Sequence, residues 1–177
     1  MGATDMFADL LSTLAVARQV HTREVGRKAE SVAHLVPPWL RGDLVQAATL
    51  HDIGYAHSDT GFHALDGARF LLAQGFNRVV CNLVARHSVS EIEAEVRGLD
   101  LCVFDEFAVS VDLDAGHSLI AWADMTTSPT GGTVTVEERL EEIQSRYGPE
   151  SLVTKFVDRA RPRLLAAGQS PTGSMRG

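Results

Sequence analysis

Apolar residues recur along much of the chain at the three- and four-residue spacing of helix faces, and several of these faces end in a histidine or an aspartate. The clearest face runs through Leu40, Leu44 and Ala48 to His51, with Asp52 at its edge. Because residues at this spacing lie on one side of a helix, the apolar stripe is expected to carry both polar side chains into the interior.

The same arrangement recurs on other predicted helix faces, where a stripe of apolar residues leads to or from a polar side chain at the spacing of a helix turn. The pattern predicts six inward-facing polar side chains in all. They are His21, His51, Asp52, His63, His87 and Asp124.

Prolines, glycines and small polar residues mark the ends of the predicted helices. Pro37-Pro38 ends a helical segment predicted over Asp5 to Val36, which is one helix or two with a bend. Turn residues between Ile53 and Gly61 separate the His51 helix from one that begins near Phe62.

The later helices carry two start signals. Ser90-x-x-Glu93 and Thr135-x-x-Glu138 both have the capping-box form, in which each end of the motif bonds the backbone of the other. A further helix is predicted over Leu99 to Phe107, and Gly148-Pro149 separates the Thr135 helix from a last one that runs to about Ala167.

These elements predict an all-α fold, a compact orthogonal helical bundle. No internal repeat or linker interrupts the pattern, and the length suits one domain. We expect that domain to span residues 1–168, with a core at about 20–124 and a C-terminal helical extension at 125–168. Residues 169–177 are expected to fray.

Composition narrows the classes of partner and compartment. The net charge of −7 and the pI of about 5.4 argue against a nucleic-acid binder, which needs a basic surface. No apolar run approaches the length of a membrane span, and two cysteines without metal-binding spacing argue against a secreted disulfide scaffold. We expect a cytoplasmic protein that acts on a small anionic molecule. The amphipathic C-terminal helices are compatible with a homo-oligomer.

Four histidines and two aspartates gathered in one interior would lose much hydration energy, and the sequence offers no matching set of buried lysines or arginines. A single inward histidine is usually a core residue bonded to the backbone. The joint pattern favours a divalent transition metal instead, since imidazole and carboxylate suit Fe, Mn, Co, Ni or Zn.

The order His, His-Asp, His, His, Asp, with His51-Asp52-Ile53-Gly54 at its centre, resembles the HD-domain superfamily of metal-dependent phosphohydrolases, specifically the HDIG type. The resemblance covers about Val20 to Asp124. It implies four core metal ligands, which are His21, His51, Asp52 and Asp124. It also implies that His63 and His87 serve a second ion, with Asp52 bridging the two.

This resemblance implies hydrolysis of a small phosphorylated molecule, a nucleotide or another phosphate monoester or diester, by a hydroxide that the metals activate. His57, in the loop after the ligand pair, is a candidate general acid. Arg86, beside His87, is the first candidate for contact with the phosphate, and Arg23 and Lys28 are others.

Two other functions remain open. The same six ligands resemble those of HD-type mixed-valent di-iron oxygenases, which act on inositol or organophosphonates. The phosphonate enzymes carry an iron-capping tyrosine about ten residues before the first histidine, where this chain has Leu11. Tyr55 is placed to substitute for it from the loop. The third reading is a metal-bearing module that senses a ligand without turnover.

Overall fold

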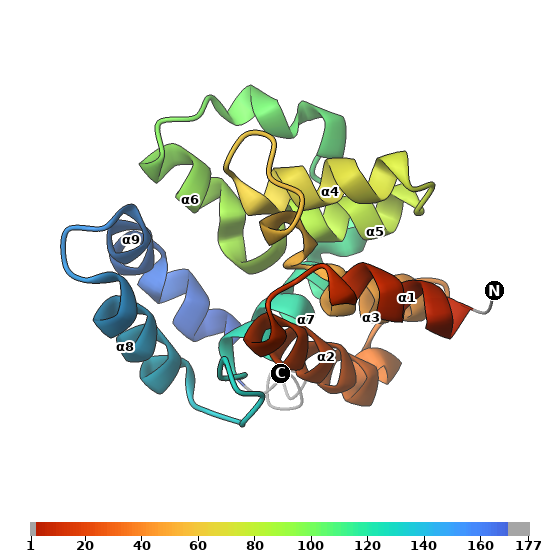
Figure 1. Cartoon of the computed structure of the whole chain (residues 1–177), viewed down its shortest axis with the longest axis horizontal. Helices are drawn as coiled ribbons and strands as arrows, with labels where there is room; N and C mark the ends of the chain where they lie inside the picture. Colours follow the sequence, from red (N-terminus) through yellow and green to blue (C-terminus); the bar gives the residue numbers. More distant parts are fainter. Residues whose placement is uncertain (1–2, 170–177) are drawn as a thin grey trace.

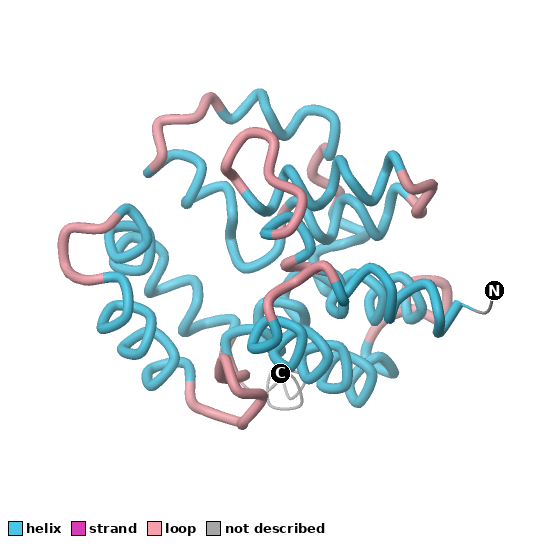
Figure 2. Tube along the Cα trace, viewed as in Figure 1, coloured by secondary structure: helices cyan, strands magenta, loops and turns pink. Residues whose placement is uncertain are grey.

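The computed structural model describes residues 3–169, and the predicted all-α class is confirmed over that range (Figure 1). Its α-helices are α1 (Ala3–Ser12), α2 (Val16–Val32), α3 (Arg41–Leu50), α4 (His63–Ala73), α5 (Arg78–Ala85), α6 (Ser90–Val96), α7 (Asp114–Met125), α8 (Val136–Tyr147) and α9 (Leu152–Ala167). Short 3-10 turns join several of them, and an isolated bridge pairs Thr127 with Thr133 (Figure 2). The C-terminal residues 170–177, predicted to fray, lie outside the described residues.

The predicted N-terminal helical segment is two helices, because the chain bends at residues 13–15 between α1 and α2. The capping box at Thr135 is confirmed, with both of its backbone bonds present. The capping box predicted at Ser90 is wrong. The Ser90 hydroxyl donates to the carbonyl of Ala85, and Val89, the residue before α6, has a left-handed conformation and provides no side-chain cap.

Two apolar clusters organise the helices. The larger lies among α2, α3, α4, α5 and α7, and it includes Leu44, Leu83 and Ile120, none of which is exposed. The smaller joins the end of α7 to α8 and α9 through residues such as Leu140 and Val157. Figure 1 shows α8 and α9 as a pair to one side, with α7 between them and α2 and α3, and with α6 beside α9. No helix of residues 3–169 combines the length and apolar character needed to cross a membrane.

Two glycines bring α4 against the turn that follows α3. A Cβ atom placed on Gly54 would lie 2.0 Å from the carbonyl oxygen of His63 and 2.6 Å from the backbone nitrogen of Gly67. Only glycine allows this approach, because the obstructing atoms are backbone and cannot rotate away. The contact fixes the first turn of α4, and therefore His63, beside the His51-Asp52 turn.

The loop between these elements is closed by Asp66 of α4. Its carboxylate accepts backbone hydrogen bonds from Asp59, Thr60 and Gly61 at 3.0–3.1 Å, and the hydroxyl of Thr60 donates to it at 2.8 Å. These donors hold the pKa of Asp66 below its usual value, although burial alone would raise it. The loop from Ala56 to Phe62 is thus tied to the helix that carries His63.

We expect Gly54→Ala to reduce the free energy of unfolding by about 1–3 kcal/mol or more, because the added methyl group must push two backbone segments apart. Gly42→Ala is the control. Its Cβ would meet no atom within 4 Å, and alanine in α3 should stabilise by up to about 1 kcal/mol. Urea unfolding of both variants measures the difference. Equal midpoints would contradict the role assigned to Gly54.

Candidate metal centre

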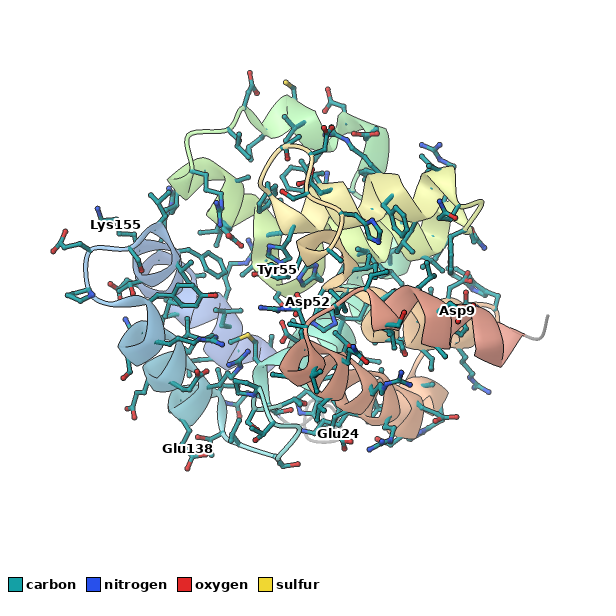
Figure 3. The ribbon with its side chains drawn as sticks, viewed as in Figure 1. Asp9, Glu24, Asp52, Tyr55, Glu138 and Lys155 are labelled. Carbon is teal, nitrogen blue, oxygen red and sulfur yellow. The ribbon has the colours of Figure 1, made fainter. Side chains whose placement is uncertain are left out.

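The six inward-facing side chains predicted from the sequence come together between α7 and the ends of α2, α3, α4 and α5. His21 lies in α2, His63 begins α4 and Asp124 lies in the last turn of α7. His51 follows the last residue of α3, and His87 begins the 3-10 turn that comes one residue after α5. Figure 3 shows Asp52 at the centre of the molecule.

Three of the four histidines are oriented by the backbone. Nδ1 of His51 and Nδ1 of His87 each lie within hydrogen-bond distance of the carbonyl three residues earlier, at 2.8 and 2.6 Å. Nδ1 of His21 lies 3.1 Å from the carbonyl of Ser128. A carbonyl can only accept, so each Nδ1 carries the proton and, in the neutral ring, each Nε2 presents a lone pair. Such bonds are typical of metal-ligating histidines.

The Nε2 atoms face one another and the two aspartates. Nε2 of His63 and Nε2 of His87 are 3.3 Å apart, and Nε2 of His21 is 3.1 Å from Oδ1 of Asp124. Nε2 of His51 is buried and has no hydrogen-bond partner among residues 3–169. It lies 3.6 Å from Asp52 and 3.8 Å from Asp124, beyond hydrogen-bond range.

A buried acceptor without a donor, such as Nε2 of His51, is costly in a dry interior. A cation beside it removes this cost. The described residues offer two groups of three that are close enough to share an ion: His21, His51 and Asp124, and His51, Asp52 and His87. The donor set therefore fits a metal.

The two carboxylates are also held in place from outside the cluster. Asp52 forms an ion pair with Arg18, whose guanidinium lies 3.6 Å above the ring of Tyr55. Oδ2 of Asp124 accepts a 2.5 Å hydrogen bond from the hydroxyl of Ser88. Ser88 can reach it because the turn there has a positive φ of 47°, which non-glycine residues rarely adopt.

The pKa values in the cluster reflect burial opposed by charge. Burial alone would raise the pKa of Asp52, but the charges of His51 and Arg18 hold it well below its usual value. For Asp124, a hydrogen bond from His21 likewise outweighs burial and lowers the pKa. Burial lowers the pKa of His51, and it lowers that of His63 to about 4.

The comparisons with known proteins agree with this geometry. The family model described as the HD domain matches residues 18–110, slightly more than half of the chain. The chain belongs to the HD-domain family. The predicted resemblance to the HD-domain superfamily is therefore confirmed, and the HDIG type stays a prediction. The match includes every cluster residue except Asp124. No curated protein and no solved structure matched the chain.

The cluster of four histidines and two aspartates opens into a cavity on one side. Asp52, His63, His87 and Asp124 line it, whereas His21 and His51 are buried with 3% and 1% of their surfaces exposed. The other lining residues include Arg18, Tyr55 and Glu93, followed by residues of α8 and α9. A molecule in the cavity would meet one side of the cluster.

The structure does not bring His57 to this cavity. Its ring stacks on Phe70 at a centroid distance of 3.6 Å, and its Nε2 lies 3.5 Å from the hydroxyl of Thr13. The loop that carries it is drawn to α4 by Asp66, which turns His57 toward α1. The interpretation of His57 as a general acid is therefore wrong.

Arg86 is also directed away from the cluster, although it precedes His87. Its Nη1 pairs with Glu91 at 2.6 Å, and its other nitrogens donate to the carbonyls of Phe104 and Phe107. It therefore anchors the segment at 101–107 and does not reach the cavity. Lys28 is bound to Thr126, and Arg23 is exposed on α2.

Arg18, rather than Arg86, Arg23 or Lys28, is the basic residue that lines the cavity beside the cluster. One feature of the sequence points to Arg18, which lies three residues before His21, close to one helix turn. Ser88 carried no comparable signal, because its reach to Asp124 depends on the left-handed turn.

The depressed pKa of His63 predicts a pH dependence of stability in metal-free protein. Between pH 6.5 and 4 the unfolded imidazole binds a proton that the folded one does not, so stability falls as the pH falls. From pH 7 to 5 this group should remove roughly 2 kcal/mol.

Chelator-treated wild type and His63→Gln are to be compared by urea unfolding at both pH values. Taking the difference cancels His21, whose pKa is raised by its bond to Asp124 despite burial and whose contribution has the opposite sign. We expect the loss between pH 7 and 5 to be smaller in His63→Gln, whereas His34→Gln, at an exposed position, keeps the wild-type loss. The same loss in all three proteins would contradict the assignment.

Proposed function

We propose that this protein is a metal-dependent phosphohydrolase that cleaves a small phosphorylated molecule, a nucleotide or another phosphate ester. The observation that carries the proposal is the set of histidine Nε2 atoms turned inward by backbone carbonyls, with that of His51 left unpartnered. Members of the HD-domain family are generally metal-dependent phosphohydrolases, which gives this cluster a reaction class.

In the proposed centre, His21, His51, Asp52 and Asp124 hold one ion, and His63 and His87 complete a site for a second, with Asp52 shared. A bound metal supplies a water molecule of lowered pKa and positive charge for the phosphoryl oxygens. The aspartates are ionised at neutral pH, since both pKa values are lowered, and are therefore ready to act as ligands.

Arg18 and Tyr55 serve the substrate in this proposal. The guanidinium of Arg18 is fixed between the Asp52 carboxylate and the Tyr55 ring at the cavity, where it can bind an anionic oxygen. Partial burial and the nearby Asp52 charge raise the pKa of Tyr55, so its hydroxyl stays protonated and remains a hydrogen-bond donor.

A di-iron oxygenase is the second candidate, and Tyr55 is the observation that favours it. Its ring stacks on His63 at 4.3 Å, so an aromatic hydroxyl does come to the cluster from the loop. The position where the related phosphonate enzymes carry their tyrosine cannot serve, because Leu11 is buried in the apolar core with 1% exposure. Metal identity separates the two candidates.

We expect protein purified without chelator to contain a divalent transition metal and to release phosphate from a panel of nucleotides and phosphate monoesters. Asp52→Ala should abolish both properties, because it removes the carboxylate shared by the proposed ions. His34→Ala should leave both largely intact, since His34 is exposed in the 3-10 turn that follows α2 and does not line the cavity. Elemental analysis and a phosphate-release assay measure the two properties.

Equal effects of the two substitutions would reject the ligand assignment. Close to two iron atoms per chain in protein purified without oxygen, with a mixed-valent paramagnetic signal and no phosphate release, would favour the oxygenase. Metal without turnover of either kind would favour a sensing module.

A further inference from the structure

Arg139 of α8 lies outside the family match and yet lines the cavity beside the cluster. Its side chain is 9% exposed, which is unusual for an arginine. Its positive charge contributes to the lowered pKa of Asp124 and opposes the rise in the pKa of His21. The guanidinium is therefore close to the proposed metal ligands.

The guanidinium has an unused donor. Nη1 of Arg139 pairs with Glu142 one turn along α8, but its Nε is buried and has no hydrogen-bond partner within residues 3–169. A guanidinium carries five N–H donors, and a buried one without an acceptor is costly. An anion in the cavity would supply the acceptor.

The charges around the cavity also favour the binding of an anion. The charged lining side chains are Arg18, Arg139 and Arg146 against Asp52, Glu93 and Asp124. Glu142 pairs with Arg139 and Arg146, and Arg97 pairs with Glu93, which adds one charge of each sign, so positive and negative charges balance. Any metal ion held by the cluster would leave the cavity positive, and a phosphate group would offset that charge.

Much of the remaining lining of the cavity is apolar and comes from the C-terminal helices. It includes Ile143, Val153, Phe156 and Val157, together with Tyr147. A ligand with its phosphate at the cluster and Arg139 would have its organic part against this surface.

We propose that Arg139 is a substrate-binding residue that donates from Nε to a phosphate oxygen, so that α8 completes the anion site begun by Arg18 in the HD core. The inference rests on the proposed function for the identity of the anion. The alternative is that Arg139 only pairs with Glu142 on α8.

The test measures binding of inorganic phosphate to metal-loaded protein by titration calorimetry. We expect Arg139→Gln to weaken phosphate binding about 10- to 100-fold, the range for a lost charge-assisted hydrogen bond, without changing metal content. Arg139→Lys, which keeps the charge and loses the fork, should give an intermediate affinity. Arg159→Gln is the matched control, since Arg159 of α9 is exposed and pairs with Glu95.

A second measurement uses the wild-type protein and does not depend on how the variants fold. The Nε–H resonance of Arg139, assigned by comparison with Arg139→Lys or by isotope labelling of the wild type, should shift when inorganic phosphate is added. Phosphate binding that leaves this resonance unmoved, or equal affinities in wild type and Arg139→Gln, would overturn the inference. Absence of phosphate binding to the wild type would overturn it as well.

The inference and the proposed function fail differently. Wild type that hydrolyses phosphate esters with the same KM as Arg139→Gln retains the function and refutes the role of Arg139. Wild type that hydrolyses no phosphate ester, but binds phosphate through Arg139, refutes the function and retains the anion site.

Discussion

The structure depends on one electrostatic constraint: lone pairs and carboxylate charges meet in an interior from which water is largely excluded. His51 shows the constraint most directly, since its Nε2 is buried without a partner. Two further Nε2 atoms, those of His63 and His87, are 3.3 Å apart. Packing of the surrounding apolar core holds these atoms together, and added positive charge would satisfy the unpartnered Nε2 of His51.

The fold meets this constraint partly with backbone groups. His51 follows the last residue of α3 and His87 lies two residues beyond the end of α5, and each histidine bonds the carbonyl three residues earlier. The helix is thereby capped and the ring is oriented in a single interaction. The close approach of Gly54 to Gly67 positions His63 through backbone packing, which needs no polar partner.

Much of this was predictable from periodicity, because a stripe of apolar residues states which side of a helix faces inward. That reasoning located the six cluster side chains and the all-α class. Nearness in sequence was a poorer guide. His57 and Arg86 lie close to candidate ligands in the sequence, but their side chains are directed away from the cavity. It also could not find Ser88, whose reach to Asp124 depends on a left-handed turn that no local preference favours.

The burial of Arg139 could not be predicted from the sequence, for another physical reason. An arginine four residues into a charged helix is ordinarily solvated, and nothing local distinguishes it from Arg146, which is 41% exposed. It is buried only because α8 and α9 share an apolar cluster with Met125, at the end of the helix that carries Asp124. The cluster residues other than Asp124 come from the family core, whereas the buried arginine and apolar cavity wall come from the extension. Since the core supplies five of the six candidate ligands and α8 and α9 supply the apolar cavity wall, substitutions in α8 and α9 can alter the cavity while leaving those five ligands in place.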